Sequence, residues 1–532
     1  MTDLALPAAG PPPRARTSSS WSIALSGLEG QPVEVEAMIA PGLPRTVLVG
    51  LPDASVYEAR DRCRSAVAAS GLRWPVTALT INLTPASLPK AGSHHDLAIA
   101  GAVLAADGAV PEEAVRSVVL LGELGLDGRV RRTPGILPAT MAARDLGFAQ
   151  VIVPAGQAAE AGLVEGIGVR SVSTLGQLVA VLRGQRPAQA PEDDEPVVTG
   201  PEPAAAGDFA DIHGQSEACH AAVVAAAGRH HLLMIGPPGV GKTMIAGRIP
   251  GILPELDPRE ALEVASIRSL LGEPVAGLDR RPPFAQPHHG CSAPALVGGG
   301  ARLARPGAAS RAHRGVLFLD EVPEFAPHVL DTLRTPLETG EVFLSRSGGE
   351  ARYPARFQLV MAANPCPCGN HGVAGRDCRC SPATVLRYRG RISGPLRDRV
   401  DITVRMLPPK SSFLGGLTAE DTPPSSVLAQ RVAQARQRQR DRLAGTGWTT
   451  NAEVPGSYLR THLPLPVGVE RLERAVLNGG MSSRGVDRAL RLAWTLADLG
   501  GRDRPIETDV KGAIALRRGT FGEGGREHAE RR

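Results

Sequence analysis

The chain has 532 residues, of which 42% are hydrophobic and 21% charged; this is typical of a water-soluble globular protein and allows about three or four domains. Its formal net charge of +5 permits a nucleic-acid partner without requiring one. No apolar run approaches the roughly 18 residues of a membrane span, and the first twenty residues lack the apolar segment of a signal peptide, so we expect a cytoplasmic protein with no membrane partner.

The chain begins with a segment, residues 1–20, that is rich in proline, alanine and serine and is predicted to be a disordered tail. Residues 21–186 then mix strand-like runs, such as 33–39 and 78–83, with helix-like stretches, such as 94–108. We expect these residues to form one α+β domain.

The rest of the chain is divided by two predicted linkers. Residues 187–207 are rich in proline, alanine and acidic residues, and residues 409–424 are rich in proline, glycine and serine. Between them, over residues 208–408, apolar strands alternate with helices, which predicts an α/β core with a parallel sheet. Apolar residues at spacings of three and four predict a helical domain over residues 425–520, followed by a polar tail at 521–532. The fold class is therefore predicted to be multidomain α/β.

The strongest motif follows an apolar run, Leu232 to Ile235, that is predicted to be a buried strand. The next eight residues fit the pattern G-x-x-x-x-G-K-[ST] of a P-loop and lead into a predicted helix. Glycines let backbone amides approach phosphates, and the helix N-terminus adds its positive dipole end. The predicted nucleotide-binding residues are Gly236, Pro237, Pro238, Gly239, Val240, Gly241, Lys242, Thr243 and Met244, the last being the expected helix start. Lys242 should reach the β- and γ-phosphates of ATP, and Thr243 should ligate Mg²⁺.

A second apolar run, Val316 to Leu319, ends in Asp320 and Glu321. An Asp at the end of such a strand helps to hold Mg²⁺ in P-loop enzymes. Glu321 is placed to activate the attacking water as a general base. The alternative is an ordinary strand that ends in two acidic residues.

Three further features come later in the chain. Asn364 follows a strand predicted over residues 357–361, where its amide could orient the attacking water, although Asn also favours a turn before proline. Arg399 suits an arginine finger that a neighbouring subunit inserts against the γ-phosphate; the alternative is a structural Arg–Asp pair. Arg484 and Arg488 share one helix face, and either could reach the phosphates from a lid.

Four of the seven cysteines form two closely spaced pairs, Cys366 with Cys368 and Cys378 with Cys380. Four thiolates could close a tetrahedral Zn²⁺ site, although the C-x-C spacing is tighter than usual and His371 is a possible substitute ligand. The alternative is four reduced thiols in a surface loop. If zinc binds, four protein ligands leave no open position, so a structural role is expected.

Taken in order, these motifs resemble those of AAA+ ATPases, and over roughly residues 21–520 the chain resembles the magnesium-chelatase-like YifB/ComM family. The residues that carry the resemblance are DFADIHGQ (208–215), GPPGVGKTM (236–244), PHHGCSAPALVGGG (287–300), HRGVLFLDEVPEF (313–325), PLETGEVFLSR (336–346), AANPCPCGN (362–370) and RYRGRISGPLRDRVDI (387–402).

The resemblance implies a helix-2 insert at 287–300 and a hairpin over 341–357 that points into the pore of a homohexameric ring. It also implies an ATP-dependent DNA helicase or branch-migration factor that acts on single-stranded or branched DNA in recombination or natural transformation. Two alternatives stay open, a magnesium-chelatase motor subunit and a protein-remodelling ATPase. The N-terminal domain argues against the first, and stimulation by unfolded protein would favour the second.

The N-terminal domain resembles the Lon-protease-like domain of this family, through residues 88–108 and 121–138. His94 occupies the position of the Lon nucleophile, Ser93 is left as a lone hydroxyl, and no lysine lies between Lys90 and Lys242. A Ser–Lys dyad cannot be assembled from these loops, so we expect a domain without protease activity.

Candidate DNA contacts are Arg346 and Arg352 on the predicted hairpin, because contacts to phosphate need only a positive group. Further candidates follow the cysteines: Arg387, Arg389 and Arg391. Others lie on a predicted helix, for which a solvated helix surface is the favoured alternative: Arg431, Arg436, Arg438, Arg440 and Arg442.

Overall fold

The computed structural model describes residues 15–50, 54–88, 90, 92–186, 207–300, 304–346, 349–373, 375–408, 422–478 and 480–519, without the side chains of residues 54, 55 and 346. Nearly all of the predicted linkers 187–207 and 409–424, and the tail 521–532, lie outside these residues.

The N-terminal domain is built on a seven-stranded mixed sheet in the order β3-β4-β2-β1-β5-β8-β9. Its strands are β1 (Arg16–Ser26), β2 (Glu29–Ala40), β3 (Arg45–Val49), β4 (Ala78–Thr84), β5 (Val119–Leu120), β8 (Gln150–Pro154) and β9 (Gly168–Val172), with a separate pair β6 (Glu123–Leu124) and β7 (Val130–Arg131). Its helices are α1 (Ala54–Ala69), α2 (Asp96–Ala106), α3 (Glu112–Arg116), α4 (Ile136–Asp145), α5 (Ala158–Ala161) and α6 (Leu175–Leu182). The expected mixture of strands and helices is confirmed.

The start of this domain differs from the prediction, because β1 begins at Arg16 within the segment predicted as a disordered tail. Residues 16–20 pair with residues 35–39 of β2. Ser20 is fully buried and donates to the Ala98 carbonyl of α2 at 2.7 Å. Small serines allow this close packing of the strand under a helix. Because they are polar, they do not form the apolar pattern from which a buried strand is predicted.

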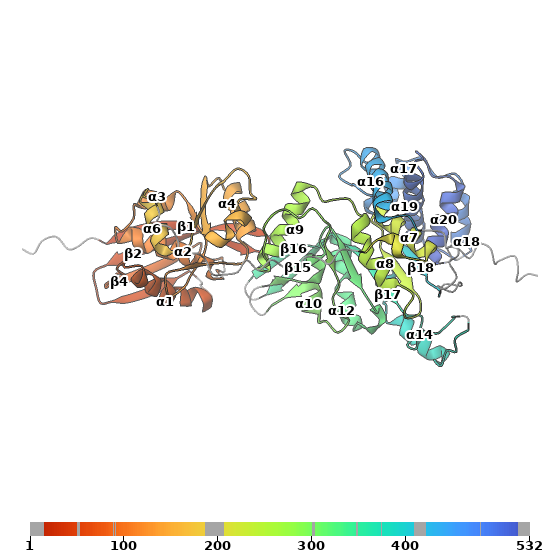
Figure 1. Ribbon diagram of the computed structural model, residues 1–532, viewed down its shortest axis with the longest axis horizontal. Helices are drawn as coiled ribbons and strands as arrows, with labels where there is room; N and C mark the ends of the chain where they lie inside the picture. Colours follow the sequence, from red (N-terminus) through yellow and green to blue (C-terminus); the bar gives the residue numbers. More distant parts are fainter. Residues whose placement is uncertain are drawn as a thin grey trace, which may run out of the picture.

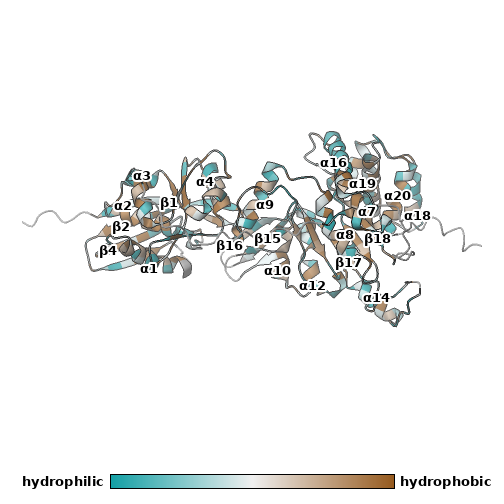
Figure 2. Cartoon of the chain, in the orientation of Figure 1, coloured by the Kyte–Doolittle hydropathy of each residue, from teal (hydrophilic) through white to brown (hydrophobic). Residues whose placement is uncertain are grey.

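The central domain contains a five-stranded, all-parallel sheet in the order β11-β14-β17-β10-β18, as predicted. The strands are β11 (Phe284–Ala285), β14 (Val316–Leu319), β17 (Gln358–Ala363), β10 (Leu232–Ile235) and β18 (Ile402–Arg405). Brown, apolar strands are visible at the centre of the molecule (Figure 2). Parallel sheets are covered by helices on both faces, which explains their nearly continuous apolar sequences.

Helices and two hairpins surround this sheet (Figure 1). The helices are α7 (Ser216–Gly228), α8 (Lys242–Arg248), α9 (Pro258–Leu270), α10 (Ala293–Val297), α11 (Ala308–Arg311), α12 (Pro327–Asp331), α13 (Arg334–Thr339), α14 (Pro382–Gly390) and α15 (Gly394–Arg399). The hairpins pair β12 (Gly298–Gly299) with β13 (Arg305–Pro306) and β15 (Glu341–Arg346) with β16 (Gly349–Pro354). The second confirms the hairpin expected before Asn364.

The C-terminal part is helical, as predicted, and packs on one side of the central sheet (Figure 1). It comprises α16 (Ser425–Arg442), α17 (Gly456–Thr461), α18 (Glu470–Leu477), α19 (Ser483–Leu499) and α20 (Glu507–Arg518). The buried Trp494 of α19 belongs to the same hydrophobic cluster as Val316, Leu232 and Ile402 of the sheet. This continuous core fixes the helices on the central domain. None of the described helices is long and apolar enough to cross a bilayer.

Among the described residues, the N-terminal domain contacts the central domain at two main places. Helices α4 and α9 pack against each other: the Gly135 amide donates to the Ser269 carbonyl at 2.9 Å, and an apolar cluster with Leu137 and Val275 lies beside them. The Ser26 hydroxyl donates to the Glu350 carbonyl of β16, and the backbone of Gly27 lies against that of Arg352. The hairpin β15–β16 therefore lies at the junction of the two domains.

We expect Asp498→Ala to destabilise the C-terminal helices. The buried Asp498 carboxylate accepts bonds from Arg442 at 2.6 and 2.8 Å, and from Asn451 at 2.9 Å. Removing it leaves the half-buried Arg442 without its counter-charge, which costs about 3–5 kcal/mol in comparable cases. Urea unfolding followed by tryptophan fluorescence measures the loss. The exposed Asp503, replaced by Ala, is the control, and equal midpoints for the two variants would contradict the assignment.

Candidate nucleotide-binding site

The loop between β10 and α8 has the backbone that a phosphate-binding loop requires. Gly239 and Gly241 have φ angles of 82° and 92°, in the left-handed region that favours glycine. A Cβ at Gly236 would lie 2.5 Å from the Met406 carbonyl oxygen, so no other residue fits there without a backbone shift. The helix begins at Lys242, two residues before the predicted start at Met244, because the left-handed Gly241 serves as its N-cap.

Lys242 is folded back on this loop and joined to the neighbouring strand. Its ammonium donates to the carbonyls of Gly236 at 2.6 Å and Pro237 at 2.9 Å, and to the Asn364 side-chain oxygen at 3.0 Å. Asn364 is in reach because β17 pairs in parallel with β10, which aligns Ala363 with Ile235. Burial lowers the pKa of Lys242, against the opposing effect of Asp320 and Glu321. The structure thus brings together two residues that the sequence placed in separate motifs.

Thr243 and Asp320 also meet. The Thr243 hydroxyl donates to Asp320 Oδ2 at 2.8 Å, and the other Asp320 oxygen accepts from the Glu321 amide at 2.9 Å. β14 lies beside β17, so its carboxyl end points to the same edge of the sheet as the P-loop. A hydroxyl and a carboxylate oxygen this close are hard oxygen ligands of the kind that Mg²⁺ prefers. The residues present therefore fit the expected magnesium ion.

Glu321 has a backbone that the sequence did not reveal. Its φ is 51°, which is uncommon for a residue other than glycine and turns the chain sharply after β14. The side chain is exposed, and its carboxylate lies 3.5 Å from Nδ1 of His289. His289 belongs to the expected insert at 287–300, and sequence reasoning did not single it out. The only signal was the His288–His289 pair.

The arginines expected near the phosphates lie at the opposite edge of the sheet. Arg399, Arg484 and Arg488 line one cavity of ≈ 370 Å³. Its other lining residues include Asp401, whose amide bonds to the carbonyl of His231 just before β10. These residues thus lie at the amino ends of the strands, whereas the P-loop lies at the carboxyl ends, on the order of 13 Å away along a four-residue strand.

This placement bears on the expectation that Arg484 or Arg488 could reach the phosphates from a lid. Arg484 and Arg488 do not reach the P-loop of their own chain, because the helices pack beside the sheet instead of over its carboxyl edge. They lie near Asp398, and Arg399 forms an ion pair with Glu338. Both an arginine finger and a structural ion pair are compatible with this arrangement of Arg399.

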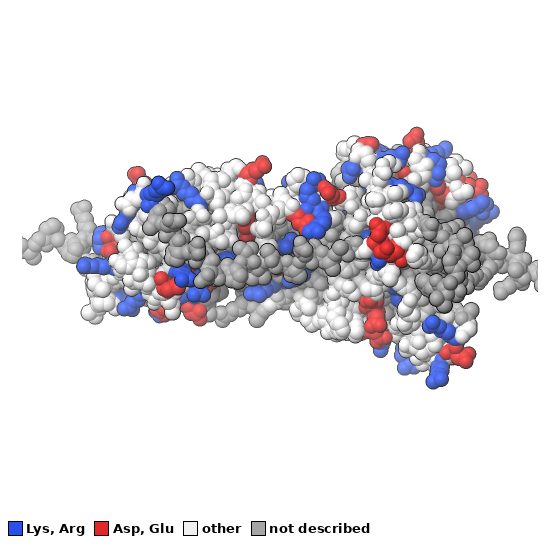
Figure 3. Space-filling model, in the orientation of Figure 1, with Lys and Arg blue, Asp and Glu red and all other residues white. Residues whose placement is uncertain are grey.

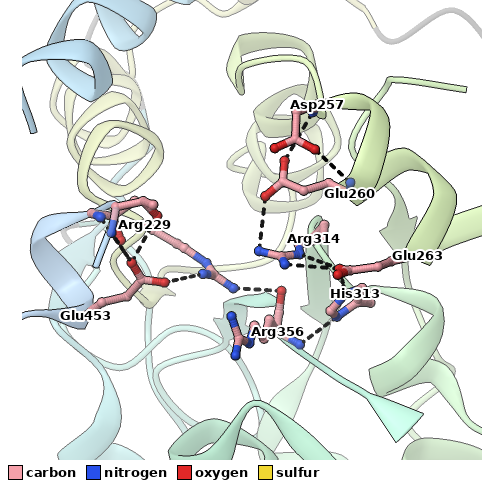
Figure 4. A network of polar contacts seen from close by, with 10 residues as sticks. Arg229, Asp257, Glu260, Glu263, His313, Arg314, Arg356 and Glu453 are labelled. Carbon is pink, nitrogen blue, oxygen red and sulfur yellow. Dashed lines mark hydrogen bonds and ion pairs between the residues drawn. The ribbon is translucent and has the colours of Figure 1, made fainter. Parts of the chain in front are cut away.

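A second charged network at the same edge joins the central and C-terminal domains (Figure 4). Arg229 donates to Glu453 at 2.9 Å and to the Arg356 carbonyl at 2.7 Å. Arg314 contacts Glu260 and Glu263, each at 3.0 Å. Burial raises the pKa of Glu263, but bonds from His313 and Arg314 outweigh it and hold the pKa at about 2. This network was not predicted from the sequence, because the residues that pair in it are far apart in the chain.

The candidate DNA-binding arginines have varied surroundings. Arg352 is exposed on β16 and stacks over the Phe343 ring at 5.2 Å, while the side chain of Arg346 lies outside the described residues. Arg389 and Arg391 bond to carbonyls of the central domain, and basic side chains mixed with acidic ones gather at the α14 end (Figure 3). On α16, three candidates are anchored inside the protein: Arg436, Arg438 and Arg442.

The four clustered cysteines converge. All four sulfur atoms lie within 4.8 Å of one another, and the group does not include the His371 ring. Cys366 is buried, Cys368 is exposed, and the other two are half-buried. Bonds from the Asn370 amide and the Cys366 thiol lower the pKa of Cys368 to about 6. Such a set of thiols has the chemistry of a metal site.

Comparison with known families covers most of the chain. The family model "Magnesium chelatase, subunit ChlI" matches residues 208–413, "Subunit ChlI of Mg-chelatase" matches residues 35–157, and "Magnesium chelatase, subunit ChlI C-terminal" matches residues 422–517.

Relatives match along nearly the whole length. An uncharacterised protein of Mycobacterium tuberculosis is 50% identical over 502 residues, which cover 94% of this chain and 98% of the relative. YifB of Escherichia coli is 40% identical over 92% of this chain and 95% of its own. Competence protein ComM of Haemophilus influenzae is 38% identical over 93% of this chain and 96% of its own. The chain therefore belongs to the magnesium-chelatase-like YifB and ComM family of AAA+ proteins.

We expect Lys242→Ala to lose most of its affinity for Mg-ATP. The substitution removes the ammonium that lies between the P-loop carbonyls and Asn364, and a charged hydrogen bond of this kind contributes about 1.5–3 kcal/mol. Titration with a fluorescent ATP analogue measures the dissociation constant. Lys511→Ala on α20 is the matched control, since Lys511 lies on the surface and pairs with Glu507 in its own helix. Unchanged affinity of Lys242→Ala for Mg-ATP would contradict the assignment of the nucleotide site to this loop.

Proposed function

We propose that this member of the YifB and ComM family is a magnesium-dependent ATPase that works as a motor on single-stranded or branched DNA, in recombination or natural transformation. Two hydrogen bonds carry the proposal: one joins Lys242 to Asn364, and the other joins Thr243 to Asp320. These contacts gather a cation, a hydroxyl, an amide and a carboxylate at one edge of a parallel sheet, which is where such folds bind nucleotides.

Each residue has a distinct role in this proposal. Lys242 and the backbone amides of the P-loop bind the phosphates, and the start of α8 adds its positive dipole end. Thr243 and Asp320 hold Mg²⁺, which supplies charge neutralisation between the phosphates when it is bound. Glu321 takes a proton from the attacking water, and Asn364 orients that water. His289, 3.5 Å from Glu321, positions its carboxylate.

A single chain holds only one half of the proposed catalytic site. Arg399, Arg484 and Arg488 lie at the sheet edge opposite the P-loop, where they can serve only the nucleotide of a neighbouring subunit. If this edge of one copy faces the P-loop of the next copy, the copies are arranged head to tail. Such a head-to-tail contact closes into a ring when the rotation between neighbouring copies allows it. We infer a homohexamer, as the family resemblance implies.

DNA is the proposed substrate of the motor. One relative is named as a competence protein, a term for uptake of transforming DNA. On this chain, the exposed Arg352 and the partly exposed Phe343 offer a charge and a ring on the same hairpin, and bases stack on such rings. Contacts to phosphate of this kind carry no sequence preference and weaken with salt.

The N-terminal domain is proposed to be a Lon-like domain without protease activity. The Ser93 hydroxyl donates to the carboxylate of Glu123, and the buried Lys90 ammonium donates to backbone carbonyls, with the Gly50 oxygen at 3.2 Å. Among the described contacts none joins this serine to this lysine, as a Ser–Lys dyad would need.

ATP turnover in the presence of different DNAs tests the proposal. The purified chain is assayed alone and with duplex, single-stranded and four-way-junction DNA, with Lys242→Ala as the inactive control. We expect single-stranded or branched DNA to raise turnover most, and the increase to fall with salt. Arg352→Ala should lower the stimulation without changing turnover in the absence of DNA. If DNA does not stimulate turnover, the proposal of a DNA motor is wrong. Stimulation by unfolded protein would then favour a protein-remodelling ATPase, and stimulation by a porphyrin-insertion partner would favour a magnesium-chelatase motor subunit.

Mixing two inactive variants tests the shared site. We expect Arg399→Ala to bind ATP but to turn it over at least about 100-fold more slowly, since an arginine finger contributes 10³–10⁵ in rate. In a mixture with Lys242→Ala, some interfaces combine an intact P-loop with an intact Arg399, so part of the activity should return. Arg397→Ala, in the same helix but bonded to the Arg389 carbonyl, is the control. No recovery at any ratio would refute the shared site.

A further inference from the structure

We propose that Cys366, Cys368, Cys378 and Cys380 bind one structural Zn²⁺, and that this centre holds the loop after Asn364 against the P-loop. The metal site stands on the geometry of the sulfur atoms alone. Its effect on ATP rests on the proposed ATPase function, and the two parts are tested separately below.

The sulfur separations fit a tetrahedral metal site. Cys366 Sγ lies 3.4 Å from Cys368 Sγ and 3.8 Å from Cys378 Sγ, and Cys368 Sγ lies 3.7 Å from Cys378 Sγ. With Zn–S bonds of about 2.3 Å, the edge of a regular ZnS₄ tetrahedron is roughly 3.8 Å. These sulfurs are therefore spaced as ligands of one ion, and too far apart for the ≈ 2.04 Å of a disulfide bond.

Four thiolates select the kind of metal. Soft sulfur ligands in a tetrahedral set favour Zn²⁺ or an iron–sulfur centre, whereas Mg²⁺ and Ca²⁺ prefer oxygen. Adding the ion also gives a reason for the cluster, since four free thiols this close gain little from one another and are open to oxidation. Because all four positions come from the protein, no open position is left for chemistry, and the role is structural.

The backbone supports the tight C-x-C spacing. The Gly369 amide bonds to the Cys366 carbonyl at 2.9 Å, which closes a turn in which Gly369 has a φ of 78°. The His371 amide then donates to Cys366 Sγ at 3.3 Å. Amides that donate to ligand sulfurs orient them and reduce their charge, as outer-shell groups do around metal sites. His371 thus supports the site through its backbone and not through its ring.

The cluster lies between three parts of the nucleotide site. Cys366 comes two residues after Asn364 and is buried. The next turn touches the P-loop, since a Cβ on Gly369 would lie 2.5 Å from Cδ of Pro238. On the far side, Arg389 donates to the Pro365 carbonyl at 3.2 Å, and Arg391 donates to the Pro323 carbonyl after the Asp320–Glu321 turn at 2.9 Å.

This placement explains what a metal would do. The loop from Cys366 to Cys380 joins β17 to α14 and has no strand or helix of its own among its described residues. Closing it on one ion fixes Gly369 beside Pro238 and anchors the start of α14, whose C-terminal end holds Arg391 against the turn after Asp320. The P-loop, the Asn364 amide and the acidic turn are then kept in one arrangement before nucleotide binds, which lowers the ordering cost of binding.

Metal analysis of the purified full-length chain tests the site without using its activity. We expect about one zinc per chain by mass spectrometry, and strong visible absorption typical of tetrahedral thiolate coordination after replacement by Co²⁺. Cys380→Ser should lose the metal, whereas Cys380→His should keep it, because three cysteines and one histidine also form a structural site. Cys291→Ser, which removes a thiol outside the cluster, is the control. Zinc absent from the unmodified chain, or retained equally in Cys380→Ser, would overturn the metal site.

ATP affinity tests the second part. In Cys380→Ser we expect the dissociation constant for Mg-ATP to rise about tenfold, and in Cys380→His to stay near that of the unmodified chain. Circular dichroism of all variants checks that they fold. Lys242→Ala should keep its zinc while it loses ATP binding, so failure of the nucleotide site and failure of the metal site give different results. A Cys380→Ser protein that loses zinc and binds ATP unchanged would refute the clamp on the P-loop.

Discussion

Parallel pairing of β10, β17 and β14 is the constraint on which the site depends. The residues of the nucleotide site come directly after the last residue of each strand. Because the strands are parallel, their carboxyl ends lie at one edge of the sheet. The bonds from Lys242 to Asn364 and from Thr243 to Asp320 then follow from sheet geometry. A strand in the opposite direction would carry its polar end to the other edge, and no change of side chain could repair that.

The same parallel order places the P-loop and the arginines at opposite edges of the sheet. Arg399, before β18, and the arginines of α19 lie at the amino ends of the strands, beside the buried ion pairs of Arg229 and Arg314. The Arg229–Glu453 pair and the shared hydrophobic core hold the C-terminal helices on the central domain, whereas the pairs of Arg314 with Glu260 and Glu263 lie within the central domain. This placement supports the proposal that these arginines act on the nucleotide of a neighbouring subunit.

The sequence predicted best what depends on local pattern. Apolar runs followed by Gly, Asp or Asn gave the parallel sheet and the residues at its carboxyl edge, because strand ends and loop residues adjoin in the chain. The sequence did not predict contacts between residues that are far apart along the chain. The Arg229–Glu453 pair joins residues 224 positions apart, and the edge reached by Arg484 depends on how α19 packs, which no spacing reveals. Two local features were also missed: the small polar serines of β1 show no apolar pattern, and nothing in the residue type of Glu321 indicates its left-handed backbone.

The contact between the domains limits how the hairpin can move. β15–β16 begins right after α13, which carries Glu338 of the arginine cavity, and its outer strand touches Ser26 and Gly27. The N-terminal domain is also held at α9, where the Gly135 amide bonds to the Ser269 carbonyl. A shift of the hairpin relative to α9 must therefore either carry the N-terminal domain along or break one of these contacts. Because a few backbone contacts are weak compared with a packed apolar cluster, we expect the hairpin contact to break first while the domain stays on α9.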